Sequence, residues 1–184
     1  MRLDSVAIAC ALGFALVSTA GCPGPRKRDH GAEIDPSSMS FLSAARALHH
    51  QADMMEDAGN PREAIEALER ARTMPRGSLT REMREVLADT TARIAELRLQ
   101  LGEVEQAQKS IAEGLTFADQ PGYFRGHLLE VRGRVLEAEA KKLKADGHLA
   151  LAETKRREAL LSFDEAVRMH EDVIRSRLAD GGNR

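Results

Sequence analysis

The apolar residues of this chain recur every three or four positions over most of its length, which is the spacing of an amphipathic helix. The first predicted helix covers residues 40–57 and ends before Gly59. Its repeating apolar positions are Phe41, Ala44, Ala45, Leu48, Ala52 and Met55. Asn60 and Pro61 then supply a capping residue and a first-turn proline for a second helix, which ends at a turn over residues 75–77.

Four more helices follow, separated by short turns. They are predicted at residues 79–101, 103–117, 121–145 and 148–179. Gly102 takes the C-terminal capping position of the third helix, and Asp146-Gly147 forms the turn before the sixth. Helices joined by short turns pack antiparallel to their neighbours, so the sequence predicts an all-α fold built from helix pairs.

The N-terminus has a different pattern. Arg2 provides a positive start, and residues 6–17 carry no charge but are too few to span a bilayer, which takes roughly 20 apolar residues. Small residues then lead to Cys22. This order is typical of a secretory signal peptide, predicted here over residues 1–21.

The end of this signal resembles the lipobox of bacterial lipoproteins. Ala20, Gly21 and Cys22 match that pattern, whereas Thr19 stands where leucine is usual. The resemblance implies that Cys22 is lipidated and becomes the mature N-terminus. Because Pro23 rather than aspartate follows, it also implies an outer-membrane anchor facing the periplasm. An ordinary signal whose cleavage happens to precede a cysteine is the alternative.

Composition excludes some classes of function and indicates how the chain is organised. The chain has 27 basic and 29 acidic residues, so it lacks the basic excess of a nucleic-acid-binding protein. Cys10 leaves with the signal, so no internal disulfide forms in the mature chain. Residues 22–39 are rich in proline and glycine and are predicted to be a flexible tether. The helical domain is placed at 40–180 and a disordered tail at 181–184.

A size pattern repeats in the second helix of each pair. A small residue is followed four positions later by a large apolar one, and three later by another small one. The triplets are Ala64, Leu68, Ala71, then Ala107, Ile111, Gly114, then Ala159, Phe163, Ala166. These spacings keep each triplet on one helix face, where small residues let a neighbouring helix approach closely.

With these triplets the chain resembles the tetratricopeptide repeat, a helix pair of about 34 residues. Units at 45–78 and 88–121 fit the pattern, with Gln51, Thr91 and Arg98 departing from it. The third unit needs both helices lengthened into a protruding hairpin. The resemblance implies a short solenoid of about three degenerate repeats, and an ordinary six-helix bundle is the alternative.

The same resemblance implies that the first helix of each pair lines a partner-binding groove. The groove positions would be Arg46, His49, Asp53, Asp89, Ala92, Glu96, His127, Glu130 and Arg134. His49 and Asp53 do not match the lysine and asparagine with which the family clamps a C-terminal carboxylate, so a free C-terminal peptide is not the expected ligand. An ordinary solvated face is the alternative for this mixed-charge set.

The sequence offers no constellation for catalysis or metal binding. His49 and His50 point about 100° apart on a helix, and His170 sits among apolar positions typical of a core or boundary histidine. No phosphate-binding loop, HExxH or CxxC motif occurs. We therefore predict a protein that is not an enzyme and needs no cofactor or metal.

Anchor, tether and repeat together favour a scaffold that binds an envelope protein. The resemblance is to tetratricopeptide lipoproteins that help secretins, pili or insertion machines to assemble. An enzyme or accessory protein of cell-wall metabolism is the alternative of a different class. Homo-oligomerisation through the long final hairpin is a third.

Overall fold

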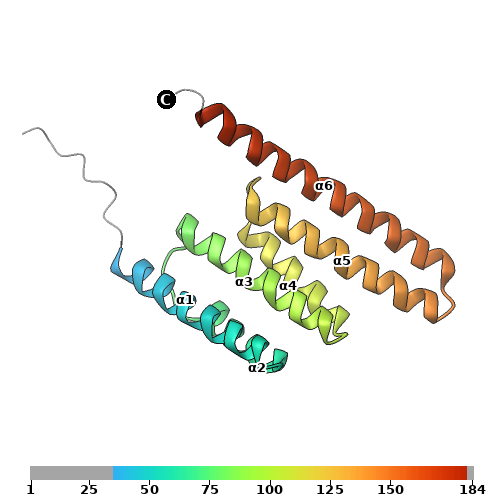
Figure 1. Ribbon diagram of the computed structural model, residues 1–184, viewed down its shortest axis with the longest axis horizontal. Coiled ribbons are helices and arrows are strands. Elements are labelled where there is room, and N and C mark those ends of the chain that lie inside the picture. The colour runs from blue at the N-terminus through green and yellow to red at the C-terminus, as the bar shows by residue number, and fades with distance from the viewer. Residues whose placement is uncertain (1–34, 182–184) are drawn as a thin grey trace, which may run out of the picture. The chain divides into compact units, whose positions relative to one another are not determined.

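The computed structural model describes residues 35–181, which form six α-helices and contain no strand (Figure 1). The all-α prediction is confirmed for this part of the chain. The predicted signal peptide, Cys22 and the tether up to residue 34 lie outside the described residues, as do residues 182–184. The first residue of the predicted tail, Gly181, is the last residue of α6. The helices are α1 (Pro36–Asp57), α2 (Pro61–Thr73), α3 (Arg81–Gln100), α4 (Val104–Phe117), α5 (Tyr123–Ala145) and α6 (Leu149–Gly181).

The same turn closes all three helix pairs. Gly59, Gly102 and Gly147 have φ values of 78°, 74° and 84°, a left-handed conformation that favours glycine. The amide of Gly59 donates to the Glu56 carbonyl, and the next amide donates to Met55. The two other turns repeat these hydrogen bonds, which satisfy the last carbonyls of the helix as in a Schellman motif. Each pair is therefore a hairpin of one design.

The predicted start of one helix and the predicted cap of another need correction. Helix α1 begins at Pro36 rather than residue 40, because the Asp35 carboxylate accepts a hydrogen bond from the Ser38 amide and Pro36 occupies the first turn. Residues 36–39 therefore belong to a helix and not to the tether. Asn60 precedes α2 as predicted, but its side chain makes no capping hydrogen bond.

Helix α3 holds the three hairpins together, since it contacts α1, α2, α4 and α5. The predicted triplets of α2 and α4 are buried in these contacts. Thr91, which departs from the repeat pattern, is fully buried, and its hydroxyl donates to main-chain carbonyls one turn earlier. It lies against Gly114 of α4, where the absence of a side chain makes room for it.

Arg98, the other departure in α3, ties neighbouring hairpins together. Its guanidinium lies 2.8 Å from the Glu69 carboxylate of α2 and 2.9 Å from the Ser110 hydroxyl of α4. Glu69 also pairs with Arg72, which reaches Glu113 of α4 at 2.7 Å. Burial disfavours the charge of Arg72, but the carboxylates of Glu113 and Glu69 outweigh it and raise its pKa.

Helix α6 packs on α5 through two glycines. Gly133 faces the ring of Phe163, and Gly126 faces the imidazole of His170. His170 is partly buried at this contact, as predicted for a boundary histidine. Between the two glycines, the buried Ser162 hydroxyl donates to the Leu129 carbonyl at 2.9 Å. Glycine on α5 therefore lets a large ring from α6 approach the helix backbone directly.

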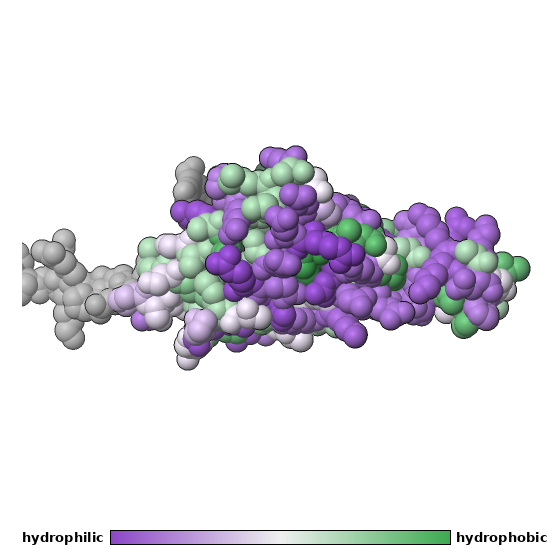
Figure 2. All heavy atoms as spheres, turned by 90° about the horizontal axis from the view of Figure 1, so that it is seen from below, coloured by the Kyte–Doolittle hydropathy of each residue, from purple (hydrophilic) through white to green (hydrophobic). Residues whose placement is uncertain are grey.

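The α5–α6 hairpin extends past the turn that joins α3 to α4 (Figure 1). Its tip has no other helix beside it, and Leu149 and Leu151 are exposed there. Figure 2 shows hydrophilic residues over most of one side of the molecule and apolar residues reaching the surface at this tip. The predicted protruding hairpin is present.

We expect Gly133→Ala to lower the free energy of unfolding by about 1–3 kcal/mol, because a Cβ would lie 2.6–2.8 Å from atoms of the Phe163 ring. Helix propensity alone would instead raise stability by about 1 kcal/mol. Urea denaturation followed by circular dichroism measures the difference. With Phe163→Leu as background the same change should cost much less, and an equal cost in both backgrounds would contradict this contact.

Candidate binding surface

Helices α1, α3 and α5, the first helices of the three hairpins, lie in succession, with α3 contacting both others. Charged side chains from all three meet along one surface, which we call the mixed-charge face. Within this face, ion pairs connect His49, Asp53, Glu56, Asp89, Arg93, Glu96, Glu130 and Arg134. Arg46 and His127 belong to it by their spacing of three residues from His49 and Glu130. Most of the residues predicted to line a groove are thus brought together.

Arg93 joins α3 to α1. Its guanidinium lies 2.5 Å from the Asp53 carboxylate and also pairs with Glu56. Burial disfavours the charge of Arg93, but the hydrogen bonds that it donates to the two carboxylates outweigh that cost and raise its pKa. Asp53 is therefore engaged within the protein rather than held free for a ligand.

Arg134 makes the corresponding link between α5 and α3. It lies 2.5 Å from Glu96 of α3 and 3.5 Å from Glu130 of its own helix. Arg93, Glu96 and Arg134 line a shallow hollow of about 310 Å³ together with Glu56 and the end of α3. The hollow presents alternating charges from three helices to solvent.

His49 is the half-buried member of the face. Its Nε2 lies 2.7 Å from the Thr90 hydroxyl, which itself donates to the Val86 carbonyl. The other ring nitrogen of His49, Nδ1, faces the Asp89 carboxylate at 4.0 Å. Burial lowers the pKa of His49, and the nearby Asp89 carboxylate only partly opposes this.

Three other residues predicted to line the groove take no part in the ion pairs between helices. Arg46 is exposed, and among the described residues it has no hydrogen bond or ion pair. His127 stacks on Tyr123 with ring centroids 6.4 Å apart. Ala92 was wrongly placed in the groove: it is fully buried in the core between α3, α4 and α5. The neighbouring Arg93, which is partly exposed, lies on the face in its place, between Asp89 and Glu96 along α3.

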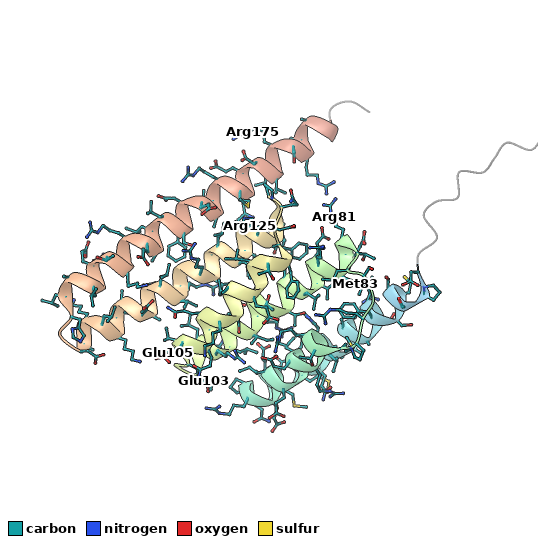
Figure 3. All side chains as sticks on the ribbon, turned by 180° about the vertical axis from the view of Figure 1, so that it is seen from behind. Arg81, Met83, Glu103, Glu105, Arg125 and Arg175 are labelled. Atoms are coloured by element: carbon teal, nitrogen blue, oxygen red, sulfur yellow. The ribbon has the colours of Figure 1, made fainter. Side chains whose placement is uncertain are left out.

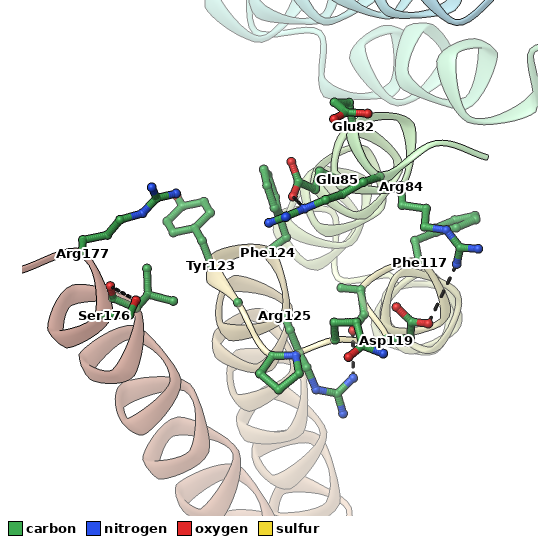
Figure 4. Close-up of a pocket in the computed structure, with 16 residues that line it drawn as sticks. Glu82, Arg84, Glu85, Phe117, Asp119, Tyr123, Phe124, Arg125, Ser176 and Arg177 are labelled. Atoms are coloured by element: carbon green, nitrogen blue, oxygen red, sulfur yellow. Dashed lines mark hydrogen bonds and ion pairs between the residues drawn. The ribbon is translucent and has the colours of Figure 1, made fainter. Parts of the chain in front are cut away.

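The sequence did not predict an end pocket of about 1050 Å³, which lies where α3 and α5 begin and α4 ends, beside the C-terminal part of α6. Phe117, Tyr123 and Phe124 line it, and Tyr123 is 55% exposed (Figure 4). Arginines surround these rings: Arg84 lies 4.0 Å from Asp119, and Arg125 donates to the Ala118 carbonyl. The aromatic residues are adjacent or nearly so in sequence, a local cluster in an otherwise aromatic-poor chain.

The end pocket is continuous with the mixed-charge face. Glu85 lies one turn before Asp89 on α3, and Tyr123 lies one turn before His127 on α5. Figure 3 shows Arg81 and Arg125 at this end of the helices and Glu103 and Glu105 at the other. A partner lying along α3 and α5 would thus meet aromatic rings and arginines at one end and mixed charge beyond them.

The described residues hold no group of three or more histidine, cysteine, aspartate or glutamate side chains placed to bind a metal ion. Among helices α1–α6, none is long and apolar enough to cross a membrane. Comparison with protein-family models, curated proteins and solved structures finds no match for this chain.

His49 gives the face a testable pH dependence. Its pKa in the folded protein is below the ordinary 6.5, so the unfolded chain binds a proton more readily. We expect the free energy of unfolding to fall as pH decreases through 6.5, and this part of the decrease to vanish in His49→Gln. Urea titrations across that range provide the measurement. The exposed neighbour variant His50→Gln should follow the unmodified protein, and identical pH curves for His49→Gln and the unmodified protein would contradict the assignment.

Proposed function

We propose that this protein is a membrane-anchored scaffold of tetratricopeptide-like helix pairs that binds another protein of the bacterial cell envelope. The observation that carries this proposal is the surface formed by α1, α3 and α5, in which every hairpin contributes side chains to one continuous face. A solenoid uses its repeats in this way, since each unit adds one strip of a binding surface.

The repeat assignment is supported by the three matching turns and by the contacts of α3. The first helices of successive hairpins contact one another, and α2 and α4 pack behind them through the small-large-small triplets. Arg98 and Arg72 link successive second helices on that far side. An ordinary six-helix bundle would not require the same turn and the same triplet in each pair.

The end pocket is the best anchoring point for a partner. Binding energy at protein interfaces concentrates in aromatic and arginine side chains at concave positions, whereas exposed ion pairs contribute only about 0–1 kcal/mol each. Tyr123, Phe124 and Arg84 are aromatic and arginine side chains that line a concave site. The ion pairs of Arg93 and Arg134 are partly exposed and contribute little. We infer that an apolar side chain of the partner enters the end pocket while the mixed-charge face selects its orientation.

The anchor in this proposal is the lipid on Cys22, supported by the lipobox resemblance of Ala20, Gly21 and Cys22. Residues 23–34 would then separate the membrane from α1. An outer-membrane position facing the periplasm follows from Pro23 by the same resemblance. The partner would be a component of an assembly such as a secretin, a pilus or an insertion machine.

Crosslinking in cells, followed by isolation of the envelope and mass spectrometry, tests the proposed scaffold. We expect one envelope protein to be captured by the unmodified chain. Capture should fall by about tenfold or more with Tyr123→Ala, because the aromatic anchor is lost. It should fall by a smaller factor with the combined reversal Arg46→Glu, Asp53→Arg and Glu130→Arg, because mainly orientation is affected.

Glu66→Arg is the matched control for the charge reversals, since Glu66 is exposed on α2, away from the face. It should leave capture unchanged, and circular dichroism should show all variants equally helical. Recovery of no protein partner by the unmodified chain would refute the scaffold. Equal capture by all variants would refute this choice of surface.

Cys22→Ala tests the anchor separately. We expect the variant to lose metabolic labelling by a fatty acid and to move from the membrane to the soluble fraction, with its thermal unfolding midpoint unchanged. The folding of residues 35–181 does not use Cys22 in this proposal. Retention of the label, or loss of folding in the variant, would contradict this division between anchor and binding module.

A further inference from the structure

Helix α6 carries most of the exposed apolar surface of the described chain. Ten large apolar side chains are exposed among the described residues, and seven of these ten belong to α6. These seven are Leu149, Leu151, Leu160, Leu161, Val167, Ile174 and Leu178, each more than half exposed. Helix α6 contacts α5 and no other helix, so most of its circumference faces solvent (Figure 1).

Five of the seven form one stripe. At 3.6 residues per turn, they project within about 40° of one another. The stripe consists of Leu149, Leu160, Val167, Ile174 and Leu178. The buried alanines that face α5, Ala152, Ala159 and Ala166, lie about a quarter of a turn away. The stripe is therefore a second apolar face of α6, separate from the one that holds the hairpin together.

Four of the five stripe residues are related in pairs about the midpoint between Leu160 and Val167. Arg156 lies four residues before Leu160, and Glu171 lies four residues after Val167. Leu149 is eleven residues before Leu160, and Leu178 is eleven after Val167. Four of the five stripe residues thus correspond to another stripe residue across this midpoint, and a base corresponds to an acid; Ile174 instead corresponds to Glu153.

We propose that this stripe binds a second copy of the same chain, with the two α6 helices antiparallel and related by a two-fold axis. In this register Leu160 of one copy lies against Val167 of the other. Arg156 lies opposite Glu171, and each contact occurs twice by symmetry. Glu153 falls opposite Ile174, where its exposed side chain can extend along the rim to solvent.

The charges favour the antiparallel arrangement over the parallel one. A parallel pair in register would place Arg156 against Arg156 and Glu171 against Glu171, and like charges in such positions oppose association. The antiparallel pair turns both repulsions into attractions. The sequence of the stripe therefore selects both the partner and its direction.

The size of the stripe sets the strength of the dimer. Leu149 and Leu178 are about 44 Å apart at 1.5 Å per residue, and a helix face about 10 Å wide offers roughly 440 Å² per copy. Stable interfaces bury about 800 Å² per partner, so we expect a weak dimer with a Kd in the micromolar range. This inference depends neither on the proposed envelope partner nor on the lipid anchor.

Charge exchange tests the proposed dimer. Sedimentation velocity of the purified full chain over a range of concentrations should show a monomer–dimer equilibrium. Arg156→Glu and Glu171→Arg should each raise Kd by about tenfold, because each places like charges opposite one another. The double variant Arg156→Glu with Glu171→Arg should restore Kd to within about threefold of the unmodified value, because both pairs become complementary again.

Glu165→Arg is the matched control for Glu171→Arg, since Glu165 is exposed and projects about 160° away from Val167 on the same helix; it should leave Kd unchanged. A monomer at every concentration would overturn the proposal. A dimer that none of the exchanges affects would overturn it as well, because association would then occur elsewhere. Rescue in the double variant would support it even if a single variant were less stable.

Discussion

The close approach of helices through small residues is the constraint on which the rest of the structure depends. Alanine supplies 13 of the 25 buried apolar residues, so the core has few bulky side chains to hold helices apart. Where α6 brings a large ring against α5, a glycine faces it, as Gly133 faces Phe163. Interiors pack densely, so each small residue specifies how near its neighbour must lie. The surface formed by α1, α3 and α5 is positioned by these contacts.

Charged side chains join the helices to one another through ion pairs. Arg93 and Arg134 join the first helices across the mixed-charge face, while Arg98 and Arg72 join the hairpins on the far side. Each pair is partly exposed and contributes little stability alone. Together they fix the register of helices whose alanine-rich contacts are nearly featureless. A partner binding to the face would meet an ordered charge pattern rather than free side chains.

Much of this arrangement was accessible from the sequence, because glycine turns and apolar spacing are local signals. Gly59, Gly102 and Gly147 marked the hairpins, and the triplets marked the buried faces. The start of α1 was missed because Pro36 and the serines after it are common to tethers and helix starts alike. The roles of Arg93 and of the end pocket were missed because both depend on residues distant in sequence. Arg93 pairs with carboxylates of another helix, and the pocket is lined by residues of four helices.

The common turn also explains how the third hairpin differs from the others. Ala52 and Ala95 precede their turn glycines by seven residues, whereas Gly133 precedes Gly147 by fourteen. Beyond the turn, Ala64 and Ala107 follow their glycines by five residues, whereas Ala159 follows by twelve. Each arm has thus gained seven residues, almost two helical turns, which keeps its faces aligned. The third hairpin has the turn and the small residues of the other two, with an extension of equal length in both helices at its tip. A hairpin of this protein can therefore be lengthened at the tip without a change in the packing of its core.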